Sequence, residues 1–274
     1  MASGETDKAV ILAAGLGTRM QEADDEARLD SKQAKAAQAG LKALMPVGRP
    51  FLDYVLTGVA DAGYRRVCLV IGPGHDAVRA YYGQEVTCRR LEITFAVQAE
   101  PKGTADAVCA AEEFANGNPF LVINADNYYP PETLEALRYL GENGLIGFDR
   151  EGLLEGSNIP PDRIARFAIL ETDGDGYLTR IVEKPSPEQV ARLREPICVS
   201  MNSWRFDERM FAALRAIKPS PRGELEIPDA VQLATDAMGI RFRSVPFSAP
   251  VLDLTDRSDV AAVSGLVQEM EVDL

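Results

Sequence analysis

Short apolar runs, each closed by glycine or polar residues, recur along the first half of the chain. They lie at residues 10–14, 67–71, 93–97 and 120–123. The runs at 10–14, 67–71 and 120–123 are typical of buried strands, and 93–97 is predicted to be a strand as well. Helices are predicted between and after them, an amphipathic one at 51–62 and others at 78–82, 103–113 and 131–140. Strands that alternate with helices predict an α/β fold with a parallel, doubly wound sheet.

The second half of the chain has a different pattern. Two strands are predicted at 166–171 and 177–183, joined by a Gly-Asp-Gly turn that is typical of a hairpin. Further strands are predicted at 197–206 and 241–246, and helices at 211–217, 226–238 and 256–270. No internal repeat or long linker separates the two halves, so we expect one domain over residues 1–274.

Composition narrows the class of protein. With 29 Lys and Arg against 42 Asp and Glu, the formal net charge is −13, which disfavours binding to a nucleic-acid backbone. The four cysteines show no C-x-x-C spacing and are expected to be free thiols. No signal peptide or membrane-spanning apolar run is visible. We therefore expect a cytoplasmic protein that acts on neither membranes nor nucleic acid.

The first apolar run ends in a loop that suits an anion. Gly15 and Gly17 let backbone N–H groups approach a ligand closely, and Arg19 adds a permanent charge. The loop lacks the G-K-[ST] of a P-loop and the third glycine of the dinucleotide fingerprint. On local features alone, a phosphate site and a plain strand-to-helix turn are both open.

Two later positions also carry groups that suit a ligand, in one case backbone donors and in the other a carboxylate. Gly103 and Thr104 open a predicted helix with free backbone donors. Asp126 follows a fully apolar strand, where open α/β sheets bind ligands, and its carboxylate suits Mg²⁺. The alternative for Asp126 is a turn residue that caps the helix at 131–140.

Two features of the sequence can be explained by a surface or structural role. The polar segment 21–40 is either a surface insertion or a mobile lid, with a short helix at 32–38 capped by Asp30 or Ser31. His75 is the only histidine and is expected to be a surface or structural residue. A Ser-His-Asp type of mechanism therefore has no support.

Taken together, the motifs resemble the sugar-1-phosphate nucleotidylyltransferases, such as glucose-1-phosphate thymidylyltransferase and its uridylyl, adenylyl and guanylyl relatives. The resemblance rests on LAAGLGTRM at 12–20, KALMPVGRP at 42–50, PKGTADAV at 101–108, NADN at 124–127, VEKP at 182–185, MNSWRFD at 201–207 and LDLT at 252–255. It implies a Rossmann-like, mixed but mostly parallel sheet flanked by helices. It also implies a nucleotide-binding half at 1–140 and a sugar-binding lobe at 141–274.

The resemblance also implies roles for particular residues. Arg19 and Lys42 would neutralise the phosphate charges of the NTP, and Lys184 would bind the sugar 1-phosphate. Mg²⁺ would be held by Asp126 and Asp253. The remaining binding residues would be Ala14, Gly15, Gly17 and Thr18 around the phosphate loop, Gln98, Gly103 and Thr104 at the base, and Glu183 and Asn202 at the sugar.

The implied reaction is attack by a sugar 1-phosphate oxygen on the α-phosphate of an NTP, with release of pyrophosphate. Two alternatives stay open, a non-sugar acceptor such as a cyclitol phosphate or a phosphonate, and a catalytically silent NDP-sugar sensor. The connection from Arg19 to Lys42 is longer than is usual in the family, and it motivates the first alternative. Relatives are often homo-oligomers, which is the one protein partner we expect.

Overall fold

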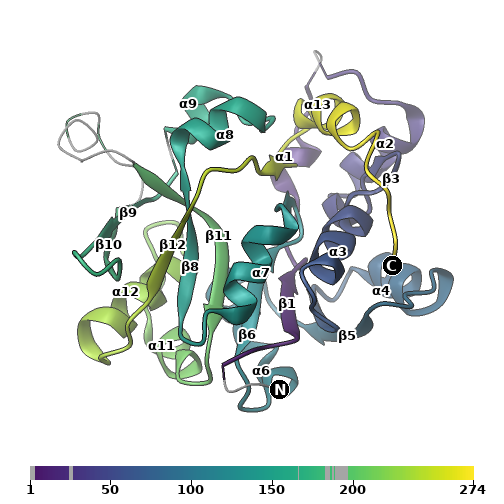
Figure 1. Cartoon of the computed structure of the whole chain (residues 1–274). Coiled ribbons are helices and arrows are strands. Elements are labelled where there is room, and N and C mark those ends of the chain that lie inside the picture. The colour runs from purple at the N-terminus through teal and green to yellow at the C-terminus, as the bar shows by residue number, and fades with distance from the viewer. Residues whose placement is uncertain (1–3, 25–26, 166, 183–185, 187, 189–196) are drawn as a thin grey trace.

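The computed structural model describes residues 4–24, 27–165, 167–182, 186, 188 and 197–274. Its centre is one large mixed sheet with the strand order β10-β9-β11-β6-β1-β4-β5; β8 pairs with β11, and β12 pairs with β8 (Figure 1). The strands of this sheet are β1 (Lys8–Leu12), β4 (Arg66–Ile71), β5 (Glu92–Val97), β6 (Phe120–Asn124), β8 (Gly144–Asp149), β9 (Ile169–Thr172), β10 (Leu178–Val182), β11 (Cys198–Phe206) and β12 (Arg243–Phe247).

The predicted α/β class is confirmed. Strands β6, β1, β4 and β5 run parallel. The second half joins this core through β11, which is antiparallel to β6, β8 and β9, while β12 runs parallel to β8. The carboxyl ends of the parallel strands therefore meet at one edge of the sheet. Two small ladders pair β2 (Pro46–Val47) with β3 (Arg49–Pro50) and β7 (Asn127–Tyr128) with β13 (Leu252–Asp253).

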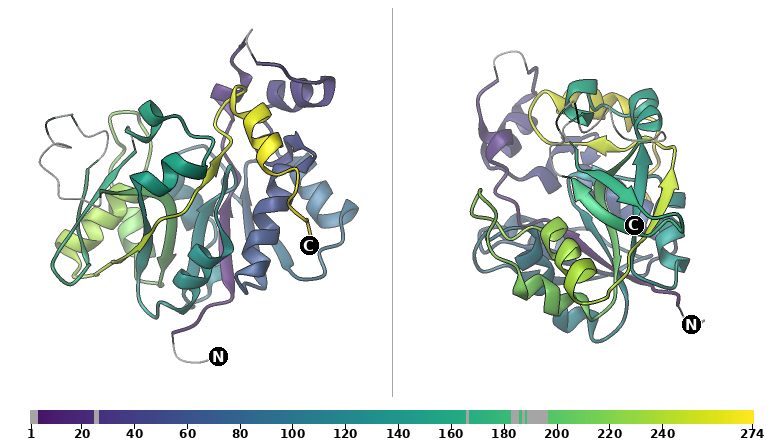
Figure 2. Two further views of the ribbon diagram at one scale, coloured as in Figure 1. Left: turned by 45° about the horizontal axis from the view of Figure 1, so that its top comes forward. Right: turned by 90° about the vertical axis from the view of Figure 1, so that its left-hand side faces the viewer.

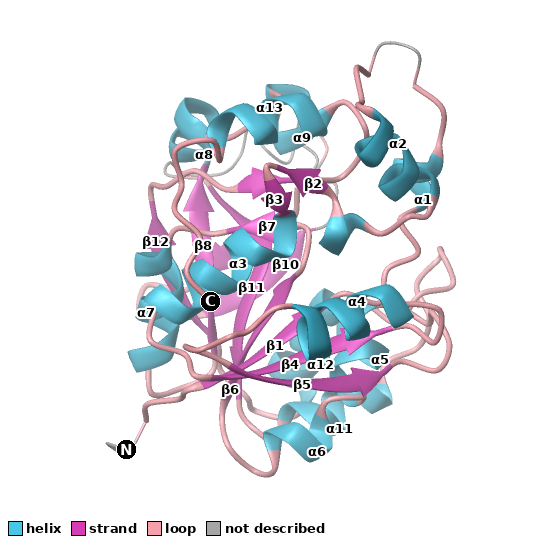
Figure 3. Ribbon diagram, turned by 90° about the vertical axis from the view of Figure 1, so that its right-hand side faces the viewer, coloured by secondary structure: helices cyan, strands magenta, loops and turns pink. Residues whose placement is uncertain are grey.

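Helices cover both faces of the sheet because alternate residues of β1 point to opposite sides. Ala9 and Ile11 belong to one apolar cluster and Val10 to the other. Figure 3 shows α3 and α4 on one side of the sheet and α5, α6 and α11 on the other. The helices are α1 (Thr18–Gln21), α2 (Ser31–Gln38), α3 (Phe51–Asp61), α4 (Asp76–Ala80), α5 (Thr104–Cys109), α6 (Glu112–Ala115), α7 (Pro131–Tyr139), α8 (Arg150–Gly156), α9 (Pro161–Ile164), α11 (Met210–Ala216), α12 (Ile227–Ala237) and α13 (Asp259–Leu266), with single turns η1 (Lys42–Leu44) and η2 (Tyr81–Glu85).

Helix α3 departs from the amphipathic helix expected at 51–62. Every residue from Phe51 to Ala60 is buried. Its one buried carboxylate, Asp53, accepts hydrogen bonds from Arg49 Nε at 2.9 Å, Tyr81 Oη at 3.2 Å and Tyr82 Oη at 2.8 Å. The charge is thus paired inside the fold, so the helix needs no polar face.

Within segment 21–40, α2 is the short helix that the sequence predicts, and this helix projects from the rest of the molecule (Figure 2). Asp30 accepts from the backbone N–H groups of Lys32 at 2.7 Å and Gln33 at 2.8 Å, and Gln33 Oε1 accepts from the Asp30 N–H at 3.0 Å. This is a complete capping box. Gln33 Nε2 also donates to the Pro46 carbonyl at 2.9 Å, which ties the segment to the fold.

Candidate active site

A cleft of ≈ 370 Å³ lies at the carboxyl ends of β1, β5 and β6. Its walls come from the glycine loop after β1, the loop before α5, the end of β6 and the turn η1. The expected site residues that line it are Ala14, Gly15, Thr18, Lys42, Gln98, Gly103, Thr104 and Asp126. Segments far apart in the sequence therefore converge where an α/β sheet binds its ligand.

The glycine loop is shaped by a second glycine from segment 21–40. Gly17 has φ 61°, and a Cβ atom there would lie 2.8 Å from Gly40 Cα. Gly40 has φ 68°, and a Cβ atom there would collide with the Leu16 carbonyl oxygen. Gly15 is exposed, with open space where its Cβ would be. The loop is thus braced from behind and open toward the cleft.

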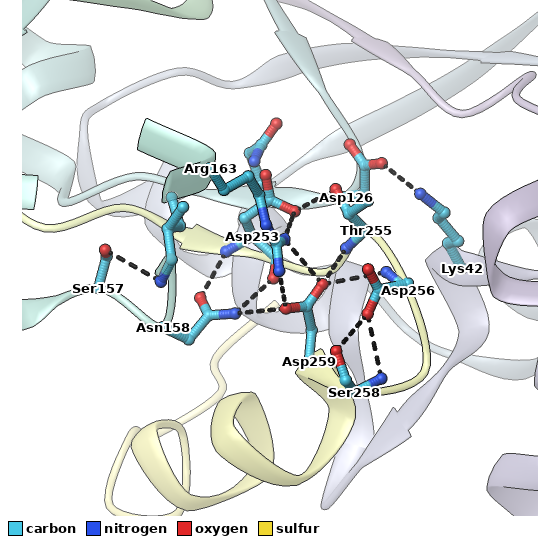
Figure 4. A network of polar contacts seen from close by, with 12 residues as sticks. Lys42, Asp126, Ser157, Asn158, Arg163, Asp253, Thr255, Asp256, Ser258 and Asp259 are labelled. Carbon is cyan, nitrogen blue, oxygen red and sulfur yellow. Dashed lines mark hydrogen bonds and ion pairs between the residues drawn. The ribbon is translucent and has the colours of Figure 1, made fainter. Parts of the chain in front are cut away.

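Segment 21–40 also delivers Lys42 to the cleft. Lys42 begins η1, directly after the Gly40 contact, and its N–H donates to the Gly40 carbonyl at 3.0 Å. Its Nζ lies 2.9 Å from Asp126 Oδ2, with the lysine side chain 19% and the aspartate side chain 29% exposed (Figure 4). The lengthened connection therefore still brings a cation to the carboxylate at the end of β6.

Asp253 joins Asp126 because β13 pairs with β7. Asp253 lies opposite Asn127, and the Leu254 N–H donates to the Asp126 carbonyl at 2.9 Å. Burial raises the pKa of Asp253 to about 6, and the negative charge of Asp126 adds to the rise. The Thr255 hydroxyl, which donates to Asp253, and the Arg163 charge act in the opposite direction. A positive charge placed between the two carboxylates would relieve this repulsion.

The donor set fits Mg²⁺. In the described part of the chain, no cluster of three or more His, Cys, Asp or Glu side chains has the geometry of a metal site. A magnesium ion held by one or two carboxylates, substrate phosphates and water needs no larger cluster. Asp126 and Asp253 carry hard oxygen donors of this kind, and they are close enough that the charge of Asp126 raises the pKa of Asp253.

A buried polar network fixes Asp253 from behind, and sequence reasoning missed it (Figure 4). Arg163 forms a double hydrogen bond with Asp259, at 2.7 and 3.0 Å, and lies 3.6 Å from Asp253 Oδ1. Asn158 accepts from the Asp253 N–H at 2.8 Å and donates to the Asp253 carbonyl at 2.7 Å. Because these residues come from segments far apart in the chain, no local motif connects them.

Other expected site residues lie outside the cleft wall. Gly17 supports the loop from behind, and Asp253 lies behind Asp126. Arg19 is exposed on α1, and among the described residues no carboxylate pairs with it. Asn202 has φ 58° at a register shift in β11 between Ser200 and Trp204. Glu183 and Lys184 lie outside the described residues.

His75 has the structural contacts expected of it, although it lines the cleft. Its Nδ1 lies 3.0 Å from the Ala13 carbonyl oxygen and 3.3 Å from the Gly72 nitrogen, so it bridges the loops after β1 and β4. Asn124 and Glu224 also line the cleft and were not expected. Glu224 precedes Leu225, whose backbone exchanges hydrogen bonds with Lys102 and Ala105, so the second half closes the wall beside Gly103.

Known proteins are similar to this chain over most of its length. The family model described as nucleotidyl transferase matches residues 8–244. A glucose-1-phosphate thymidylyltransferase of Streptomyces griseus is 28% identical over 273 residues, which cover 96% of this chain and 66% of that protein. A UTP–glucose-1-phosphate uridylyltransferase of Haloferax volcanii is 27% identical over 227 residues, which cover 82% of each.

Solved structures share the fold. A UDP-glucose pyrophosphorylase complexed with UDP-glucose aligns with a TM-score of 0.71 at 19% identity, over 97% of this chain and 100% of that one. The chain spans only 56% of a low-salt glycan biosynthesis nucleotidyltransferase of Haloferax volcanii, to which it is 28% identical over 82% of its own length. None of the helices in the described ranges is long and apolar enough to cross a membrane. The match over residues 8–244 shows that this chain belongs to the nucleotidyl transferase family.

Proposed function

We propose that the protein transfers a nucleotidyl group from an NTP to a sugar 1-phosphate, giving an NDP-sugar and pyrophosphate. The observation that carries the proposal is the meeting of Lys42, Asp126 and Asp253 after the end of β6, at a cleft that the glycine loop also lines. Relatives named as thymidylyl- and uridylyltransferases of glucose 1-phosphate support the choice of acceptor.

The glycine loop and the nearby cations are suited to the NTP phosphates. Gly15 presents an open backbone to the cleft, and Arg19 stands exposed one turn beyond it. Lys42 has its ammonium inside the cleft wall, where it can neutralise charge that develops on the reacting phosphate. Local cations of this kind are needed because the whole chain carries a net charge of −13, which repels anionic substrates.

Asp126 and Asp253 are the residues that we propose hold Mg²⁺. When bound, the ion would screen the phosphate charges and orient the α-phosphate. Lys42 donates to Oδ2 of Asp126, and no described residue donates to Oδ1 of Asp126, so this oxygen would be open to the ion. The ammonium of Lys42 has two further N–H groups, which can bind a substrate phosphate.

No general base is needed, because a sugar phosphate is ionised near neutral pH and is itself the nucleophile. The protein has to hold the nucleophile in line and exclude water. We propose that Lys184 binds the sugar 1-phosphate and that Glu183 and Asn202 bind the sugar. The strained backbone of Asn202 supports its role, since such conformations are concentrated at functional sites. Residues 1–140 would then hold the nucleotide and 141–274 the sugar phosphate within one domain.

The proposal is tested by pyrophosphate release with Mg²⁺, in a panel of NTPs against hexose 1-phosphates. We expect turnover that needs both substrates and that falls by about a hundredfold or more in Asp126→Asn. Asp175→Asn removes the same charge from an exposed turn and is the matched control. Turnover confined to cyclitol phosphates or phosphonates would establish the first alternative. Tight NDP-sugar binding without turnover would establish the sensor.

A further inference from the structure

The side chain of Gln98 is held in a single orientation by two acceptors. Gln98 follows β5, is 6% exposed and anchors its own N–H on the Ile71 carbonyl at 2.9 Å. Its Nε2 donates to the Gly103 carbonyl at 2.9 Å and to Asp106 Oδ2 at 2.9 Å. A carbonyl and a carboxylate only accept hydrogen bonds, so the amide nitrogen has to face them.

The amide oxygen of Gln98 is consequently the atom left for a ligand. No described residue donates to Oε1, and this oxygen keeps contact with solvent. Gln98 lines the cleft, as does Gly103, whose backbone N–H has no acceptor among the described residues. The cleft thus presents an acceptor, Oε1 of Gln98, close to a donor, the N–H of Gly103. The orientation of Gln98 fixes which of the two positions accepts a hydrogen bond and which donates one.

Gly103 cannot be replaced by a residue with a side chain without a clash. Its φ is 113°, and a Cβ atom there would lie 2.6 Å from the Leu225 nitrogen. Asp106 lies on the first turn of α5, which opens directly after Gly103. The Gly103 carbonyl is a fixed part of the backbone, whereas the second acceptor is the Asp106 side chain. Of the two acceptors that orient Gln98, Asp106 is therefore the one that a mutation can remove.

We propose that Asp106 is a positioning residue for nucleotide selection. By accepting the amide N–H of Gln98, it turns the amide oxygen toward the base. UTP and CTP differ at one edge by an exchange of donor and acceptor, and GTP and ATP differ in the same way. A fixed order of donor and acceptor fits one member of each pair and sets like groups face to face in the other, which costs binding. This inference rests on the proposed function, in which the base binds beside Gln98.

The test is Asp106→Leu, which keeps about the same size of side chain but has no atom that can accept from Nε2 of Gln98. Asp106→Ser, whose hydroxyl is too short to hold Nε2, is a second variant in case the first does not fold. Glu100→Gln removes a carboxylate from the same loop and is the matched control, since Glu100 is exposed and pairs with Lys102 at 3.0 Å. Each protein is measured with UTP, CTP, GTP and ATP, by pyrophosphate release and by the thermal shift that each NTP induces.

We expect the wild-type protein and Glu100→Gln to favour one NTP within a pair. In Asp106→Leu the ratio of kcat/KM within that pair should fall by about tenfold or more, the effect of one misplaced buried hydrogen bond. An unchanged ratio in a variant that keeps the wild-type Tm would overturn the inference, as would a wild-type protein whose thermal shifts do not discriminate within either pair. Selective thermal shifts without pyrophosphate release would instead contradict the proposed reaction and leave the role of Asp106 standing.

Discussion

Asp253→Asn is predicted to make the protein more stable and far less active. A pKa raised from the ordinary 3.8 to about 6 means that the ionised carboxylate costs the folded state about 3 kcal/mol. The folded state binds the Asp253 proton more tightly than the unfolded state does. Stability is therefore lost as the pH rises from about 4 to about 6. The amide variant escapes this loss, because it carries no charge at any of these pH values.

The assay is thermal unfolding in EDTA at pH 4.5 and pH 7.5. At pH 7.5 the variant should unfold about 5 °C above the wild-type protein, and at pH 4.5, where about a third of the cost is present, the gap should shrink to about 2 °C. Pyrophosphate release by the same variant should fall by about a hundredfold or more. Asp175→Asn, on an exposed turn, should change neither quantity. A variant with a lower Tm at pH 7.5, or a gap that is equal at both pH values, would refute the argument that burial and repulsion raise the Asp253 pKa.

Three further predictions concern other parts of the cleft. Lys42→Met should lower kcat/KM by about a hundredfold, because it removes the ammonium beside Asp126; steady-state kinetics will measure this, and an unchanged value would contradict a phosphate role. Gly103→Ala should destabilise the fold by about 1–3 kcal/mol through its clash with Leu225, whereas Gly74→Ala, which meets nothing within 4 Å, should be nearly neutral in the same denaturant titration. Mg²⁺ at about a hundred times its Kd should stabilise the wild-type protein by about 2.7 kcal/mol, and Asp126→Asn should lose this gain in differential scanning fluorimetry.

Local signals in the sequence were sufficient for the first half of the fold. Strands β1, β4 and β6 contain uninterrupted apolar runs, and the Asp30 capping box marks the start of α2. The burial of α3 was not predictable in the same way. Its periodicity suggests one exposed face, and only the tertiary contacts of Asp53 with Arg49, Tyr81 and Tyr82 show why a charged residue is buried there.

Strand β8 was missed because its glycines hide the pattern of a strand. A Cβ atom at Gly144 would lie 2.5 Å from the Arg243 carbonyl oxygen, and one at Gly147 would lie 2.8 Å from Ser244 Oγ. These glycines permit the close pairing of β8 with β12, which follows about a hundred residues later in the chain. Glycine usually signals a turn, so sequence reasoning left this strand of the central sheet unassigned.

The candidate site, too, could be predicted only in part from local signals in the sequence. The glycine loop, Gln98 and Asp126 follow strand ends and are visible as motifs. The residues that hold them in place are not, because Arg163 and Asp259 meet only after α9 and α13 come together. A motif names the groups that touch a ligand, whereas the network that orients those groups is spread over the chain.

The central claim is that the chain catalyses attack on the α-phosphate of an NTP, and the fate of a radioactive label tests it most directly. The protein is incubated with Mg²⁺, a hexose 1-phosphate and its preferred NTP, labelled in parallel reactions at the α- or the γ-phosphate. We predict that the α-label appears in the NDP-sugar and the γ-label in pyrophosphate, both only when the sugar phosphate is present. A γ-label transferred to the acceptor, or released as inorganic phosphate, would contradict the account.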